Sequence, residues 1–432
     1  MANENIRVVL ADHYDLVVGD TFQLFYRGII EAPNPYVYSI VSVCEKGKNF
    51  PRYFEYTPQE EGKHLLTVSV YDANRNLLGS ASTTLNVVMP KKPANSVNIL
   101  CIGDSLTQEG IWTQEVFRRI NQDGGLPCGL GFNNVNFIGN CKKDDVGFEA
   151  FGGWTWDRFV SDKIGAIWIE APNNKTEKDQ HSLWQDENGA IWQIETLQID
   201  YLKMNRYKDH TSPRPTSGIL THYKNAVNTE PIRFYSSSDE GITPFYDKDS
   251  KRIDFKSYLS RLGVDKLDIV YILLGANGLM RPEAINNTKR EYCKLVVKEA
   301  KVLVDKLKAD LPNVKVKILA PPLPSVKGGI GSNYGAELPL ADCYELIHYI
   351  MELNLAYQNL ALENEYKDFV EFINLASQFD SEYSYPFIDK PVNARSTITE
   401  RLDVNASHPN YEGKMQMADA VYRNLIKEIS KF

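Results

Sequence analysis

Short, almost wholly apolar runs that alternate with amphipathic segments are the feature that most restricts the fold of this chain. Four such runs follow residue 96, and they span 97–102, 267–274, 314–319 and 369–373. Strands that are apolar along their whole length are buried on both faces, and they occur in parallel sheets that helices cover. The sequence therefore predicts an α/β domain built on a parallel sheet.

The segments between these runs have the three- and four-residue apolar spacing of helices. Helices are predicted near 111–120, 291–307, 342–359 and 415–429. In such domains the reactive groups lie at the carboxyl ends of the parallel strands. Ser105, Asn277 and the Pro321-Pro322 turn each follow one of the predicted strands. We therefore expect them at one edge of the sheet.

Residues 5–88 follow a different pattern, with short β-type runs and no helical periodicity. The runs are 6–10, 21–26, 36–40, 65–71 and 82–88. Regularly spaced strands separated by turns predict an antiparallel β-sandwich of immunoglobulin-like size. The next residues are rich in proline and lysine and cannot continue a strand. We therefore divide the chain into a sandwich domain at 1–90, a linker at 91–96 and an α/β domain at 97–432.

A long stretch at 164–260 interrupts the α/β pattern. Asn188-Gly189 and the polar turn at 247–251 each predict a β-hairpin, so we interpret the stretch as a β-rich insertion. It holds many aromatic residues, namely Trp168, Trp184, Trp192, Tyr201, Tyr207, Tyr223, Phe234, Tyr235, Phe245 and Tyr246. Aromatic rings can stack on sugar rings or fill a small core. The sequence leaves both interpretations open.

Charge and composition argue against several classes of function. Lys plus Arg number 48 against 56 Asp plus Glu, a net charge of -8, so no basic field would attract nucleic acid or anionic lipid. No apolar run reaches the roughly 18 residues that a membrane-spanning helix needs. The first ten residues lack the pattern of a signal peptide, which predicts a cytoplasmic protein. The cysteines include no C-x-x-C pair, which argues against a zinc site or a disulfide framework.

Four short motifs contain residues that could do chemistry. They are Gly103-Asp104-Ser105-Leu106, Phe151-Gly152-Gly153-Trp154-Thr155, Leu274-Gly275-Ala276-Asn277-Gly278 and Ser407-His408-Pro409-Asn410-Tyr411-Glu412-Gly413. A serine such as Ser105, directly after a buried strand, is either the N-cap of a helix or a nucleophile held at a strand-to-helix turn. A glycine such as Gly153 lets the backbone approach a substrate closely. His408 precedes the last predicted helix, and the other six histidines lack a comparable context.

These four motifs, in this order, resemble the conserved blocks of the SGNH/GDSL hydrolase superfamily. The resemblance covers roughly residues 98–431 apart from the insertion. It implies a three-layer, flavodoxin-like α/β fold and a serine esterase in which Ser105 is the nucleophile and His408 the general base. It further implies an oxyanion hole made by the N–H groups of Ser105 and Gly153 and by the Asn277 side chain.

The chain departs from the family pattern in two places. Gly278 replaces an aspartate of the third block, and Asn405 stands three residues before His408, where the family usually has an aspartate. Asp403 lies five residues before the histidine, and we interpret it as the third catalytic residue. The alternative is a Ser-His dyad helped by Asn405 or by a backbone carbonyl, because an amide orients an imidazole but does not stabilise its positive charge as well.

The resemblance implies acyl transfer with no metal and no organic cofactor. Because the insertion is polar and aromatic, and because a β-sandwich is attached, we expect removal of acetyl groups from carbohydrate. The alternatives are a lipase, arylesterase or thioesterase on the same scaffold, and a non-catalytic glycan-binding protein. The expected partner is a small-molecule or oligosaccharide ester. No nucleic acid or membrane is expected, and the oligomeric state stays open.

Overall fold

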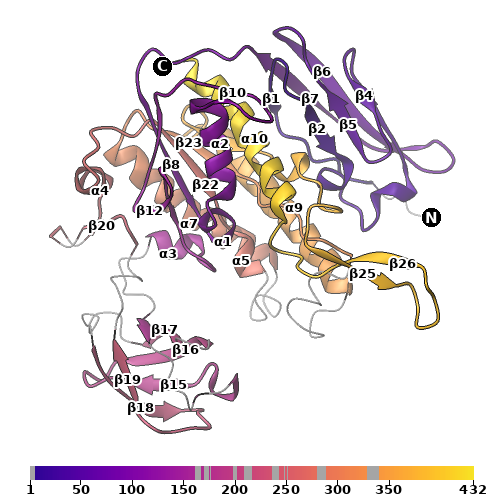
Figure 1. The fold of residues 1–432 in the computed structure, drawn as a ribbon. Helices are drawn as coiled ribbons and strands as arrows, with labels where there is room; N and C mark the ends of the chain where they lie inside the picture. Colours follow the sequence, from indigo (N-terminus) through magenta and orange to yellow (C-terminus); the bar gives the residue numbers. More distant parts are fainter. Residues whose placement is uncertain are drawn as a thin grey trace. The chain divides into compact units, whose positions relative to one another are not determined.

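The computed structural model describes residues 5–160, 167–169, 175, 177–197, 202–208, 217–235, 243–247, 249–250, 252–279, 289–327 and 340–432. The chain forms two compact units, Trp156–Tyr258 and the remainder (Figure 1). The remainder contains both the N-terminal sheets and the α/β sheet. No described helix is long and apolar enough to cross a membrane.

The centre of the larger unit is a seven-stranded, mostly parallel sheet. Its strands are β8 (Val97–Gly103), β11 (Val135–Ile138), β12 (Cys141–Lys143), β13 (Val146–Ala150), β22 (Ile269–Leu273), β23 (Lys315–Leu319) and β24 (Val370–Ile373). The order is β12-β13-β8-β22-β23-β24, with β11 also paired to β8. Only the pairing of β12 with β13 is antiparallel. The four predicted strands are all present, and β8 and β22 lie side by side at the centre.

Four long helices accompany this sheet, close to the predicted positions. They are α2 (Ile111–Asn121), α7 (Lys289–Asp310), α9 (Leu340–Leu362) and α10 (Tyr411–Ile429). Helix α2 contacts α10, and α7 contacts α9. The core joins apolar residues of β8 and β22 to those of α2 and α10, with Trp112 and Val421 among them. Two short helices, α1 (Ser105–Gln108) and α5 (Ala276–Leu279), begin near the ends of β8 and β22.

The N-terminal residues form two further sheets, called here the N-terminal sheets. One has the order β1-β7-β6-β3 and the other β2-β5-β4. Their strands are β1 (His13–Val17), β2 (Phe22–Phe25), β3 (Ser39–Val43), β4 (Lys48–Asn49), β5 (Tyr53–Tyr56), β6 (Gly62–Tyr71) and β7 (Leu77–Val88). Side chains from both sheets share one core, as Leu16 and Phe54 do. The pairing of β1 with β7 is parallel, unlike the antiparallel ladder that the sequence predicts.

The first predicted strand, at 6–10, is not a strand. Ile6 donates its N–H to the carbonyl of Leu78 and Val9 donates to that of Ile29, so these neighbouring residues bond to two different segments and no ladder forms. Strand β1, which was not predicted, begins at His13, three residues after the end of the predicted strand. The alternation of apolar and polar residues did not distinguish the two positions.

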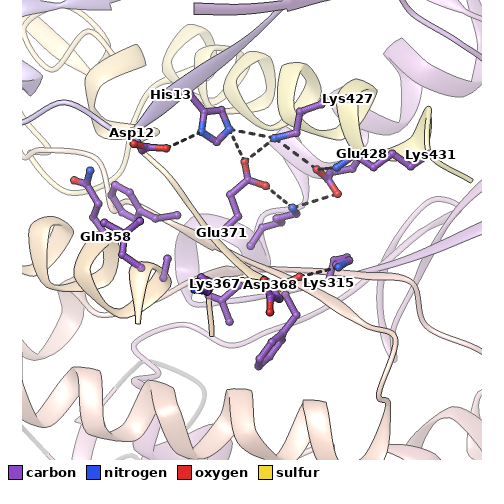
Figure 2. Close-up of a pocket in the computed structure, with 16 residues that line it drawn as sticks. Asp12, His13, Lys315, Gln358, Lys367, Asp368, Glu371, Lys427, Glu428 and Lys431 are labelled. Atoms are coloured by element: carbon purple, nitrogen blue, oxygen red, sulfur yellow. Dashed lines mark hydrogen bonds and ion pairs between the residues drawn. The ribbon is translucent and has the colours of Figure 1, made fainter. Parts of the chain in front are cut away.

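A partly buried group of charges joins the N-terminal sheets to the α/β sheet (Figure 2). His13 on β1 lies 2.9 Å from Glu371 on β24, and Lys427 of α10 lies 2.7 Å from the same carboxylate. Lys317 of β23 pairs with Glu371 and also with Glu428. The N-terminal sheets are therefore bound to the α/β sheet through paired charges as well as through the chain connection.

The smaller unit contains a six-stranded sheet in the order β14-β17-β16-β15-β18-β19. Its strands are β14 (Ile167–Ile169), β15 (Leu183–Gln185), β16 (Ile191–Leu197), β17 (Leu202–Lys208), β18 (Ser217–Lys224) and β19 (Ile232–Tyr235). The Asn188-Gly189 hairpin joins β15 to β16, and the second predicted hairpin pairs β20 (Tyr246–Asp247) with β21 (Arg252–Ile253).

Most described aromatic residues of this unit form its core and do not face solvent. Trp184, Trp192, Phe234 and Phe245 are buried. The indole N–H of Trp184 donates to Ser182 Oγ at 2.8 Å, and that of Trp192 donates to Asp186 Oδ2 at 2.9 Å. Tyr246 is half-buried and Tyr223 is exposed. The side chains of Trp168, Tyr201, Tyr207 and Tyr235 lie outside the described residues. The interpretation that this group stacks on sugar is therefore wrong for the four buried rings.

Candidate active site

Ser105 is presented at the carboxyl end of β8 without serving as a helix cap. The N-cap of α1 is Asp104, whose Oδ1 accepts a hydrogen bond from the Leu106 N–H at 3.0 Å. Ser105 is the first residue of the helix, so its hydroxyl is not used for capping. Gly103 is required at the end of β8, two residues before Ser105, because a Cβ there would lie 2.1 Å from Thr107 Oγ1. The alternative interpretation of Ser105 as an N-cap is therefore wrong.

His408 reaches Ser105 from the loop that leads into α10. Its Nε2 lies 2.9 Å from Ser105 Oγ. The loop is fixed by Asn405, whose Oδ1 accepts the N–H of Ser407 at 3.1 Å and of His408 at 2.9 Å. The other ring nitrogen, Nδ1, lies 3.2 Å from Ser407 Oγ. Two residues 303 positions apart are thus brought into hydrogen-bond contact.

Asp403, the predicted third member, makes different contacts. It is fully buried, and its carboxylate accepts hydrogen bonds from Arg401 Nε at 2.9 Å and from the Ser325 hydroxyl. Among the described residues the imidazole of His408 is hydrogen-bonded to Ser105 and Ser407. A catalytic role for Asp403 stays a prediction, and so does the alternative dyad helped by Asn405 or by a backbone carbonyl.

The two predicted oxyanion donors other than Ser105 lie at the ends of neighbouring strands. Gly153 follows β13, which pairs with β8, and has the left-handed φ of +73° that glycine favours. A Cβ at Gly153 would meet nothing within 4 Å, so its surroundings are open. Asn277 follows β22, and its Nδ2 donates to Asp104 Oδ2 at 2.9 Å and to the Trp154 carbonyl at 3.0 Å. Both N–H groups of Asn277 are thus already hydrogen-bonded.

The departure at Gly278 has a packing cause. A Cβ at this position would lie 1.7 Å from the Tyr292 hydroxyl oxygen on α7, so no side chain fits while that ring is in place. An aspartate at this position would require the Tyr292 ring to move.

The pocket at Ser105 is small, with a free volume of about 20 Å³. Residues that sequence reasoning missed form part of its wall. The lining residues are Asp104, Ser105, Leu106, Ala276, Asn277, Pro322, Pro324, Ile350, Tyr385, Ala406, Ser407 and His408. Pro322 belongs to the predicted Pro321-Pro322 turn after β23, whereas Pro324, Ile350 on α9 and Tyr385 were not predicted.

Burial sets the protonation of both titratable groups beside Ser105. Burial lowers the pKa of His408 below its ordinary value of 6.5, Lys414 lowers it further, and Glu109 opposes the shift. The imidazole is therefore neutral and able to accept a proton at neutral pH. Burial also raises the pKa of Asp104 to about 7, although the Leu106 N–H favours the carboxylate.

No protein-family model matches this chain, and no curated protein matches its sequence. Several solved structures are similar in fold. An inhibitor-bound aryl esterase from M. smegmatis is 14% identical, with 76% of this chain and 98% of that one covered and a TM-score of 0.33. A carbohydrate acetylesterase from Sinorhizobium meliloti is 13% identical, with 76% and 98% covered and a TM-score of 0.32.

A third similar structure spans nearly the whole chain. It is a carbohydrate esterase family 2 enzyme with a carbohydrate binding domain from Corynascus thermopiles, which is 14% identical. The comparison covers 99% of this chain and 100% of that one, with a TM-score of 0.29. All three of these proteins are described as esterases.

Proposed function

We propose that this chain is a serine esterase that works through an acyl-enzyme. The observation that supports it most directly is the 2.9 Å contact between Ser105 Oγ and His408 Nε2 at the carboxyl end of β8. A nucleophile within hydrogen-bond reach of a neutral base is the arrangement that activates serine. Because His408 is neutral at pH 7, it can take the proton as Ser105 attacks.

The proposed reaction has two steps. In the first step Ser105 Oγ attacks the ester carbonyl while His408 takes the proton of the Ser105 hydroxyl. His408 then gives this proton to the departing alcohol. A water molecule, deprotonated by His408, hydrolyses the acyl-enzyme and releases the acid. The backbone N–H groups of Ser105 and Gly153 are the proposed donors to the oxyanion. Asn277 is the third, and it reaches the oxyanion by turning an N–H away from Asp104 or from Trp154.

The substrate we propose is an acetyl ester of carbohydrate. The pocket of about 20 Å³ suits a short acyl group, because a space of that size holds little more than one water molecule. The sugar would lie outside this pocket. A lipase is disfavoured by the same restriction, whereas an arylesterase or thioesterase on short acyl groups stays an alternative.

A panel of p-nitrophenyl esters tests the acyl preference. We expect kcat/KM to be highest for the acetate ester. It should fall by at least about tenfold from acetate to butyrate and again from butyrate to octanoate, since overfilling a site costs about 1–3 kcal/mol. Acetylated xylose or chitin oligomers, assayed by acetate release, should be hydrolysed as well. The matched control is Ile350→Ala, which widens the pocket and should relax the preference. A wild-type preference for octanoate would contradict the proposal.

The pH dependence of kcat/KM tests the state of His408. The base must be neutral, so activity rises with pH through its pKa, and because burial lowers that pKa the midpoint is expected below pH 6.5. Glu109→Gln removes a charge that raises this pKa, so its midpoint should move further down. A midpoint above pH 7 would contradict the predicted environment. Any second inflection near pH 7 is assigned to Asp104 and should be absent in Asp104→Asn.

The pH profile of kcat/KM also distinguishes a catalytic triad that includes Asp403 from a dyad of Ser105 and His408. Replacing a true triad carboxylate by its amide lowers kcat by about 10⁴-fold. Because Asp403 is bonded to Arg401 and Ser325, we expect Asp403→Asn to lower the melting temperature but to leave the midpoint of the profile unchanged. A loss near 10⁴-fold with a shifted midpoint would establish Asp403 as the orienting residue.

A further inference from the structure

The wall of the Ser105 pocket includes Tyr385, the last residue of the segment 380–385 between β24 and α10. Tyr385 from this segment lines the pocket and is 1% exposed. Its hydroxyl donates to the Leu323 carbonyl at 2.6 Å, and Leu323 lies between the two prolines that also line the pocket. The position of Tyr385 therefore fixes two neighbouring parts of the wall.

This segment is held from outside the α/β sheet by the N-terminal sheets. Arg52, one residue before β5, donates to Asp380 Oδ1 at 3.1 Å and Oδ2 at 2.5 Å. It also donates to Glu382 Oε2 at 3.1 Å. Tyr36 donates its hydroxyl to the same oxygen at 2.5 Å. A bidentate guanidinium–carboxylate pair fixes direction as well as distance.

The α/β part of the unit holds the same segment from its other side. Arg401 Nη2 donates to the carbonyls of Tyr383 at 2.9 Å and Tyr385 at 2.7 Å. Gln416 of α10 accepts the Asp380 N–H at 2.9 Å. Removal of the Arg52 contacts would therefore free one side of a segment whose other side remains attached.

Among the described residues the charges around this segment are balanced, which favours a structural role. The ring of Tyr383 has Lys327 at 3.9 Å, Arg52 at 4.4 Å and Arg401 at 5.3 Å from its centre. These three cations lie with three carboxylates, those of Asp380, Glu382 and Asp403. Such a neutral group of charges has no surplus to attract an anionic ligand.

We infer that the N-terminal sheets are a structural part of the active site, and that Arg52 is a positioning residue that holds Tyr385 against the Ser105 pocket. The inference rests on the proposed esterase function of that pocket. It makes the N-terminal sheets more than an independent binding module or spacer. Tyr36 supports Arg52 by fixing Glu382.

The test compares two arginine variants of the full chain. Arg52→Met removes the guanidinium, and we expect kcat/KM to fall roughly 10- to 100-fold, mostly in kcat, because small misplacements near a reacting centre are costly. The matched control is Arg7→Met. Arg7 pairs with Glu31 at 2.5 Å and with Glu352 of α9, so it also joins the N-terminal residues to the α/β part, away from residues 380–385. Its kcat/KM should stay within about twofold of wild type.

Hydrogen exchange of the backbone amides supplies a readout that does not depend on catalysis. Exchange at 381–385 should accelerate in Arg52→Met and stay unchanged in Arg7→Met. Arg52→Lys keeps the charge but not the two-pronged contact, and should recover part of the activity. If Arg52→Met does not fold, Tyr36→Phe, which removes one hydroxyl, should show the same faster exchange with a smaller loss in kcat.

The outcomes separate this inference from the proposed function. The inference would be overturned if the wild type is active and Arg52→Met matches Arg7→Met in both kcat/KM and hydrogen exchange. The proposed esterase function would not be affected by that result. A wild type that hydrolyses no ester would overturn the proposed function. Faster exchange at 381–385 would in that case still support the role of Arg52 in holding the wall.

Discussion

Replacing Ser105 or His408 by alanine is expected to lower kcat by about 10⁶-fold in each case, and the double variant should lose no more than either single variant. Each residue works only through the other: without His408 the hydroxyl keeps its proton, and without Ser105 the base has no nucleophile to activate. The residual rate should come from the oxyanion donors. Acetate release measured by titration with purified variants checks this.

The control for this prediction is stability. Asp104 caps α1, and among the described residues the Ser105 hydroxyl is hydrogen-bonded only to His408, so Ser105→Ala should melt within a few degrees of wild type. Hydrolysis retained by Ser105→Ala would contradict the proposed mechanism. Wild-type binding of an acetylated oligosaccharide without any acetate release would instead favour the non-catalytic glycan-binding alternative.

The strands and helices of the α/β part were predictable because burial on both faces removes the polar alternation. Strand β8 shows this, since all its residues but Asn98 are buried. Strands β11 and β13 were not predicted, although both pair with β8. They are short, and their residues are buried by neighbours distant in sequence, which no local pattern reveals.

The chemical residues were predictable for a different reason. Ser105 and Asn277 follow two predicted strands, β8 and β22, and parallel strands place their carboxyl ends at a common edge. Gly153 follows β13, which was not predicted, so only the motif resemblance pointed to it. Tyr385 and Arg52 were missed because nothing in their neighbouring residues signals a site. Their roles come from contacts between residues distant in sequence: Arg52 bonds to Asp380, 328 positions away, and Tyr385 to Leu323, 62 positions away.

Aromatic content was the most misleading sequence feature. Trp184 and Trp192 face each other across the β15–β16 hairpin, and both indole N–H groups have buried acceptors. A sequence pattern shows that such rings exist but not which side of a sheet the core occupies. Specificity for a sugar has to come from other residues than these two.

The second large effect concerns Asn277, for which Asn277→Ala is expected to lower kcat by about 10²–10³-fold with little change in KM. An oxyanion donor acts on charge that exists only in the transition state, so its loss affects kcat more than substrate binding. Asn277→Asp keeps the shape but replaces the donors with a carboxylate beside Asp104, and it should lose at least as much activity.

The hydrogen bonds of Asn277 offer a second explanation for a loss of activity in Asn277→Ala. Its amide bridges Asp104 and the Trp154 carbonyl, so the residue could act only by holding the loop that carries Gly153. In that case Asn277→Ala would lower the melting temperature and raise KM, with a loss in kcat below about tenfold, because the backbone donors would remain. An unchanged melting temperature with a large loss in kcat would require an Asn277 N–H to leave one of its present partners during the reaction.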